Sequence, residues 1–161
     1  MFLNGRWRGS HEIGEVGGKS GVAQPYSGEY IDFGSLQGGA MLDHIIISVS
    51  DLAASKAFYE QTLAPLGYTV VFDFPEGCGF GVLEKPDFFI RQGESVTPKI
   101  HVAFTSRDRG AVDEVHAAAI AAGGTDNGAP GLREDYHPDY YGAFFFDPDG
   151  HNIEAVCHRP Q

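Results

Sequence analysis

The chain has 161 residues, of which 42% are hydrophobic and 12% aromatic, enough for one globular domain with a hydrophobic core. Its net charge of -11 makes phosphate backbones and anionic membrane surfaces unfavourable partners, so neither nucleic-acid binding nor membrane binding is expected. No apolar run approaches the roughly 20 residues of a membrane-spanning helix. The only two cysteines, Cys78 and Cys157, fit a reduced cytoplasmic protein.

The first forty residues differ in composition from the rest of the chain. Ten of the 22 glycines lie in residues 1–40, mixed with polar side chains and without apolar periodicity. This composition is typical of a flexible arm or linker, and Met41 is a second candidate for the natural start. We assign no chemistry to residues 1–40 and expect one domain at residues 41–161.

From residue 41 onward the chain repeats its own pattern after 57 residues. The segment 44–51 (HIIISVSD) aligns with 101–108 (HVAFTSRD), with histidine on histidine and a final aspartate on aspartate. Each segment predicts a strand that ends in a helix N-cap, Asp51 or Asp108, and an amphipathic helix follows. We interpret the repeat as an internal duplication.

Short β-rich runs complete each copy. In the first copy the predicted strands are 68–74, 79–84 and 87–91, separated by turns at 75–77 and 85–86. In the second copy the predicted strands are 141–146, 152–157 and a weak one within 125–135. The turn 147–150 (DPDG) joins the two clear strands as a hairpin, and we expect His151 to lie on the hairpin surface without a functional role. We therefore predict an α+β fold of two tandem βαβββ modules, about 41–95 and 98–158, whose mixed sheets form a curled half-barrel around a cavity.

Strand alternation places three metal-ligating side chains on the sheet faces that no helix covers. His44 and His101 open the two repeated strands, and Glu154 lies in the middle of the last strand. A carboxylate in an apolar strand is costly unless something pairs with it. Two imidazoles and one carboxylate suit a divalent ion and leave positions for substrate oxygens. The alternative is that each histidine is an ordinary core or surface residue.

Four segments give residues 41–161 a resemblance to a known family. They are 43–45 (DHI), 50–52 (SDL) with Phe58-Tyr59, the strand opening at His101, and 147–154 (DPDGHNIE). The chain resembles the vicinal oxygen chelate superfamily, which includes glyoxalase I, fosfomycin-resistance proteins, bleomycin-resistance proteins and extradiol dioxygenases. The resemblance implies paired modules, a homodimer and a metal site formed by His44, His101 and Glu154.

The departures from this family narrow the function. Glyoxalase I has a fourth ligand, a carboxylate, and the matching position here is about Arg91, which cannot bind a cation or act as a base. Glyoxalase I itself is therefore disfavoured, with Glu84 and Glu94 as the remaining carboxylates nearby. Fosfomycin-resistance enzymes share the three-ligand pattern, but Ile46 stands where they have a threonine. Bleomycin-resistance proteins bind their drug without protein metal ligands, so the predicted triad argues against that reading.

We expect a metal-dependent enzyme whose divalent ion (Zn, Mn, Fe(II) or Ni) chelates vicinal oxygens of a small-molecule substrate. Lyase, isomerase, transferase and dioxygenase chemistry all remain open. The alternative is a small-molecule binding or sequestering protein of the resistance type, with an empty or vestigial metal site. Tyr136 and His137 are candidates for proton transfer, although their loop can equally be a surface loop with packed tyrosines. The expected substrate contacts are Arg91, Ser48, Thr105 and Tyr141.

Overall fold

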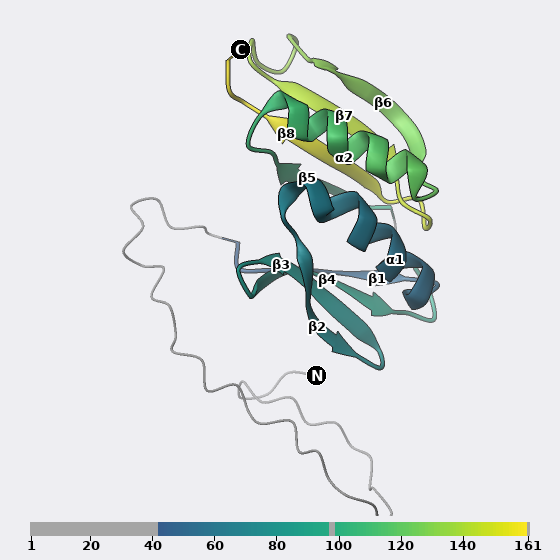
Figure 1. Cartoon of the computed structure of the whole chain (residues 1–161). Coiled ribbons are helices and arrows are strands. Elements are labelled where there is room, and N and C mark those ends of the chain that lie inside the picture. Colours follow the sequence, from purple (N-terminus) through teal and green to yellow (C-terminus); the bar gives the residue numbers. More distant parts are fainter. Residues whose placement is uncertain (1–41, 97–98, 161) are drawn as a thin grey trace, which may run out of the picture. The chain divides into compact units, whose positions relative to one another are not determined.

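The computed structural model describes residues 42–96 and 99–160, and the arm expected at residues 1–40 lies outside them. The first module contains β1 (Ile45–Val49), α1 (Leu52–Leu63), the short 3-10 helix η2 (Ala64–Leu66), β2 (Thr69–Phe74), β3 (Gly77–Val82) and β4 (Lys85–Gln92). The second module contains β5 (His101–Thr105), α2 (Arg109–Ala121), β6 (Thr125–Leu132), β7 (Tyr141–Phe146) and β8 (Asn152–Cys157) (Figure 1).

The two modules have the same topology. Their sheets have the strand orders β1-β4-β3-β2 and β5-β8-β7-β6. In each sheet the strand before the helix pairs in parallel with the last strand of the module, and the other pairs are antiparallel. The prediction of two tandem βαβββ modules with mixed sheets is confirmed, and the two sheets do not close into a barrel.

Both predicted helix starts are capped by their aspartates. Asp51 Oδ1 accepts a hydrogen bond from the backbone N–H of Ala54 at 3.0 Å. Asp108 Oδ1 accepts one from Ala111 at 2.8 Å. Each carboxylate thus satisfies a backbone donor that has no partner within its own helix. These caps fix the point where each repeated strand turns back over its sheet.

Two strand boundaries differ from the sequence prediction. The turn between β3 and β4 falls at Leu83 and Glu84, both with positive φ (51° and 62°), so Lys85 and Pro86 belong to β4. A two-residue hairpin of this kind needs positive φ at both central residues, which glycine or asparagine usually provides. Because Leu83 and Glu84 are neither, the turn was predicted at Lys85 and Pro86 instead. The weak strand within 125–135 is β6, whose pairing with β7 shifts register on both sides of Gly128.

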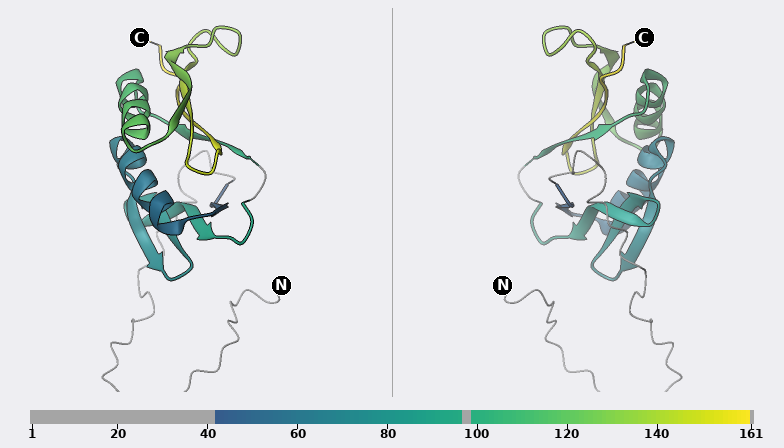
Figure 2. Two further views of the ribbon diagram at one scale, coloured as in Figure 1. Left: turned by 90° about the vertical axis from the view of Figure 1, so that its right-hand side faces the viewer. Right: turned by 90° about the vertical axis from the view of Figure 1, so that its left-hand side faces the viewer.

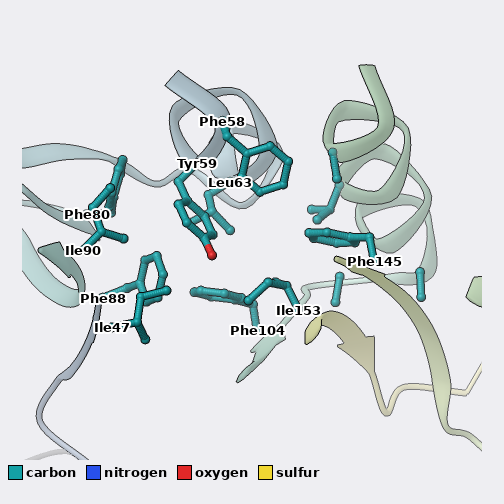
Figure 3. Packing of buried hydrophobic residues seen from close by; sticks show 14 of the residues in the cluster. Ile47, Phe58, Tyr59, Leu63, Phe80, Phe88, Ile90, Phe104, Phe145 and Ile153 are labelled. Carbon is teal, nitrogen blue, oxygen red and sulfur yellow. The ribbon is translucent and has the colours of Figure 1, made fainter. Parts of the chain in front are cut away.

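The helix-covered faces of the two sheets share one hydrophobic core. Rings from both modules meet in it: Phe88 contacts Phe104 and Phe58 contacts Phe145, at centroid distances of 5.2 and 6.3 Å (Figure 3). Helices α1 and α2 pack against each other on one side, with the strands on the other (Figure 2). The uncovered faces remain accessible, as the exposure of Ile46 (57%) on β1 and the exposure of His101 on β5 show.

The turn 147–150 of the second module packs against the first module. Asp147 is buried and accepts hydrogen bonds from Tyr59 Oη of α1 at 2.6 Å and from the backbone N–H of His151 at 2.7 Å. His151, which was expected on the hairpin surface, is also fully buried, and its Nε2 lies 3.1 Å from the backbone oxygen of Ser48. The surface reading was wrong because this turn faces the first module instead of solvent.

Burial raises the pKa values of both groups in the contact between Asp147 and Tyr59. Burial raises the pKa of the Asp147 carboxyl, although the Tyr59 and backbone donors partly oppose that effect. Burial, together with the Asp147 charge, also raises the pKa of Tyr59 well above its ordinary value. The phenol therefore acts as the hydrogen-bond donor of the pair.

Two further observations concern the described residues as a whole. Cys78 and Cys157 are both buried and free of disulfides, and burial raises the pKa of the Cys78 thiol to about 11. Within residues 42–96 and 99–160, neither α1 nor α2 has the length and apolar character needed to cross a lipid bilayer.

Candidate functional site

An imidazole and a buried carboxylate meet on the uncovered face of the second sheet. His101 Nε2 lies 3.0 Å from Glu154 Oε2, and the Glu154 side chain is only 2% exposed, whereas that of His101 is 49% exposed. The pair forms because β5 and β8 are parallel neighbours in which Glu154 lies opposite Ala103, two residues along from His101. Side chains two residues apart share a strand face. Two of the three expected metal ligands are therefore in contact.

A tyrosine absent from the predicted site holds the other carboxylate oxygen. Tyr140 Oη donates to Glu154 Oε1 at 2.5 Å, and burial and this carboxylate raise the pKa of the phenol to about 12. Gly142 makes room for the contact: a Cβ there would lie 3.0 Å from Glu154 Oε1 and 3.1 Å from the Tyr140 ring. Tyr140 precedes β7 in an irregular segment, so no strand or helix period pointed to it.

An asparagine row supports the other side of the imidazole. Asn152 Nδ2 lies 2.8 Å from His101 Nδ1, and Asn127 Nδ2 donates to Asn152 Oδ1 at 3.0 Å. Asn152 shares its strand face with Glu154, and this alternation was readable from the sequence, although its contact with His101 needed the pairing register. The ring of Phe144 stacks beside His101 at a centroid distance of 6.2 Å.

His44 does not join this pair within the chain. Its Nδ1 lies 2.7 Å from Asp43 Oδ1, and its ring meets that of Phe89 at 5.6 Å. The hydrogen bond to His44 lowers the pKa of the Asp43 carboxyl. Among the residues that the structure describes, no three histidine, cysteine, aspartate or glutamate side chains come together as a metal-ligating group. A single chain therefore presents the predicted triad as a pair and a separate histidine.

The pairing register corrects the position that corresponds to Glu154 in the first module. Glu154 pairs with Ala103, and the equivalent residue of β1, Ile46, pairs with Phe89. The residue matched to the fourth ligand of glyoxalase I was about Arg91, which instead pairs with Ser48. A phenyl ring, and not a guanidinium, replaces the carboxylate beside His44.

The other predicted site residues lie in different places. Ser48 and Thr105 lie on the uncovered faces of their sheets, half-buried and exposed respectively. Tyr141 does not face Glu154: its Oη donates to Asp113 of α2 at 2.8 Å, on the helix-covered side. Tyr136 is exposed and stacks edge-on with Tyr140, and His137 Nδ1 accepts from the backbone of Asp139. Glu154 has no hydrogen bond to Tyr136 or His137.

Phenyl rings cover the glycines on the uncovered face of the first sheet. The ring of Phe89 lies over Gly79, and that of Phe74 lies over Gly77, each so close that a Cβ would collide. Phe72 also lies on this face, because it pairs with Gly79 across β2 and β3. This surface is apolar and partly solvent-exposed, and Arg91 at its edge is exposed.

Comparisons with known proteins agree with this architecture. Residues 41–155 match the family model of the Glyoxalase/Bleomycin resistance protein/Dioxygenase superfamily. A crystal structure of a glyoxalase/bleomycin resistance protein from Albidiferax ferrireducens is 30% identical, with a TM-score of 0.64 over 75% of this chain and 100% of that one.

Two further solved structures share the fold at lower identity. One is a glyoxalase/bleomycin resistance protein/dioxygenase family enzyme from Burkholderia phytofirmans, 24% identical, with a TM-score of 0.59 over 74% of this chain and 100% of the other. The second is a glyoxalase-related enzyme from Fulvimarina pelagi, also 24% identical, with a TM-score of 0.53 over 70% and 84% of the two chains. Fold, duplication and family model agree, and the chain belongs to the Glyoxalase/Bleomycin resistance protein/Dioxygenase superfamily.

Proposed function

We propose that this chain is a metal-dependent enzyme in which a divalent ion, held by His44, His101 and Glu154, chelates vicinal oxygens of a small-molecule substrate. The observation that carries the proposal is the contact between His101 and the buried Glu154. A buried carboxylate needs compensating positive charge or several donors. One phenol and one imidazole N–H supply two donors, and a divalent cation bound by both His101 and Glu154 would take the place of the imidazole N–H.

The donor atoms fit an ion. His101 Nε2 and Glu154 Oε2 are 3.0 Å apart, a span that two neighbouring ligands of one ion cover when each bond is about 2.0–2.2 Å. His44 is prepared as a ligand too, because its Nδ1 faces the Asp43 carboxylate, which can only accept. The proton then lies on Nδ1, and the lone pair of Nε2 is free to bind metal.

We propose that two chains complete the site. The uncovered faces of both sheets are accessible, and the ligands of one chain do not form a group of three within its described residues. A two-fold dimer can place the first sheet of one chain against the second sheet of its partner. Two equivalent sites result, each taking His44 from one chain and His101 with Glu154 from the other.

Several residues of the chain have separate roles around such a metal site. Bound at this position, a divalent ion supplies Lewis-acid stabilisation of negative charge on substrate oxygens. Tyr140 keeps Glu154 Oε1 occupied and thereby leaves Oε2 as the ligating atom. Arg91 lies on the uncovered face of the first sheet, where its guanidinium can pair with a substrate anion. Tyr136 and His137 stay candidates for proton transfer at the rim.

The reaction type, among lyase, isomerase, transferase and dioxygenase, follows from the substrate and the ion, for which Zn, Mn, Fe(II) and Ni are candidates. The free buried thiols of Cys78 and Cys157 favour a cytoplasmic location. The second candidate function is a small-molecule binding or sequestering protein. The phenyl-covered face of the first sheet favours it, since apolar ligands bind such surfaces.

Metal content and mass test the proposal together. Plasma mass spectrometry on purified protein should find about one divalent ion per chain, and light scattering should give about twice the chain mass of 17.4 kDa. Protein without stoichiometric metal that also takes up no Zn, Mn, Fe(II) or Ni would overturn the enzyme proposal and leave the binding protein.

A further inference from the structure

Four hydrogen bonds form a continuous row through the second sheet. Asn127 donates to Asn152 at 3.0 Å, Asn152 Nδ2 faces His101 Nδ1 at 2.8 Å, and His101 Nε2 faces Glu154 Oε2 at 3.0 Å. Tyr140 closes the row by donating to Glu154 Oε1. Because Asn152 Oδ1 already accepts from Asn127, its amide offers a donor to His101. The imidazole therefore accepts at Nδ1 and donates from Nε2 to Glu154.

This proton arrangement is the wrong one for a metal ligand. A neutral imidazole has one N–H, so a cation at Nε2 requires the proton to lie on Nδ1. The Nδ1–H then needs an acceptor at the position where Asn152 offers a donor. Rotating the Asn152 amide by half a turn presents Oδ1 to Nδ1–H and points Nδ2 at Asn127. Asn127 is exposed, so its own amide can reverse in the same way.

The first module has no such freedom. His44 Nδ1 faces the carboxylate of Asp43 at 2.7 Å, and a carboxylate accepts whichever way it rotates. This contact favours the form of His44 that binds metal at Nε2. The histidine beside Glu154 has an amide behind it, and an amide, unlike a carboxylate, can serve both proton positions.

Building on the proposed function, we propose that Asn152, supported by Asn127, is a positioning residue that sets which nitrogen of His101 carries the proton. Binding of a divalent cation is coupled to reversal of both amides. Without metal the row keeps His101 and Glu154 paired with each other, so the buried carboxylate retains two donors. With metal the same row supplies the acceptor that a ligating imidazole needs.

Nitrogen-15 NMR of the His101 ring, assigned with a His101→Gln variant, reads the proton position directly. At about pH 8.5, where an ordinary imidazole is neutral, metal-free protein should show the proton on Nε2. Zinc-loaded protein should show it on Nδ1, and the side-chain amide signals of Asn152 should shift with it. A metal-free ring protonated at Nδ1, or a zinc-loaded ring unchanged from the metal-free one, would overturn the coupling.

Two substitutions of Asn152 separate this role from a merely structural one. Asn152→Leu removes the acceptor and should weaken zinc binding about 10- to 100-fold, with little change in the melting temperature of the metal-free protein. Asn152→Asp keeps an acceptor and should bind zinc at least as tightly as wild type at about pH 8.5. A structural role alone would place both variants below wild type.

Asn127→Ala provides the matched test of the second amide. It should weaken zinc binding by about two- to threefold, and this loss should vanish in the Asn152→Leu background, because the two residues act through one contact. Unchanged zinc affinity in Asn152→Leu would overturn the inference and leave the metal site standing. Wild-type protein that binds no zinc or other divalent ion would instead overturn the proposed function, while the metal-free NMR result still tests the row.

Discussion

The two modules share a topology and differ in the chemistry around their histidines. In the second module His101 contacts Glu154, and an amide, Asn152, lies behind it. In the first module His44 contacts the ring of Phe89, and a carboxylate, Asp43, lies behind it. Both copies thus have the imidazole, and only the second has a carboxylate beside it. Structural equivalence therefore does not make two positions chemically equivalent, and the proposed metal site takes a different part from each module.

Removing the carboxylate that distinguishes the second module should have the largest effect. Glu154→Gln keeps the side-chain shape but loses the anion, so zinc affinity should fall by about 100-fold or more, beyond the 10- to 100-fold typical of an outer partner. Competition with a chromophoric chelator measures this loss. Glu134→Gln, on an exposed loop residue, is the control and should bind as wild type does.

The same variant should leave the fold intact, because the glutamine can still accept from Tyr140. The melting temperature of the metal-free protein should stay within a few degrees of wild type. Wild-type zinc affinity in Glu154→Gln would show that another carboxylate is the ligand, and Glu84 and Glu94 would be tested next.

Adding to the first module the carboxylate that the second module has should tighten zinc binding. Phe89 occupies the position equivalent to Glu154, so Phe89→Glu places a carboxylate beside His44 and should tighten zinc binding by about tenfold. The control is Phe72→Glu, which adds the same charge to the same sheet face without that equivalence. Equal zinc affinities in the two variants would argue against the register that relates the modules.

The contact between the modules predicts a moderate effect on stability. Tyr59→Phe removes the donor to the buried Asp147 and should lower the free energy of unfolding by about 1–3 kcal/mol. Tyr141→Phe breaks a hydrogen bond to the exposed Asp113 and should cost less than about 1 kcal/mol. Urea denaturation compares the two, and equal losses would mean that the buried turn contributes no more than a surface contact.

The smallest expected effect is the pH dependence of this contact. Because burial raises the pKa of Asp147, the folded protein binds a proton more readily than the unfolded chain does. The contribution of Asp147 to the free energy of unfolding therefore falls as pH rises from about 4 through the raised pKa, by at most about 1.4 kcal/mol per pH unit. Relative to Asp147→Asn, wild type should lose stability over this range and then level off. A difference that instead grows with pH would contradict the sign.

The sequence predicted the modules well, because their signals are local. Asp51 and Asp108 are helix caps by residue type and position, and the 57-residue repeat predicted the shared topology. The β3–β4 turn was misplaced because Leu83 and Glu84 adopt positive φ without glycine. The strand pairing makes Phe89 the equivalent of Glu154, whereas the resemblance to glyoxalase I had pointed to about Arg91.

The site was harder to predict, since its contacts join distant segments. Glu154 and His101 could be placed on one face by strand alternation, but no period locates Tyr140 in its irregular segment. His151 appeared exposed because the partner that buries it, the β1 strand, lies 103 residues earlier in the chain. Separation of His44 from the pair depends on how the modules pack, which alternation within a strand does not reveal.

Mixing two variants that each bind zinc poorly tests most directly whether modules of different chains form one metal site. His44→Ala and Glu154→Gln homodimers should both bind zinc poorly. In a heterodimer one of the two sites combines His44 of one chain with Glu154 of the other and is intact. After unfolding and refolding an equal mixture, about one quarter of the wild-type tight zinc sites should return, as random two-fold pairing requires. No regained site in the mixture would contradict the shared site and with it this account of the two modules.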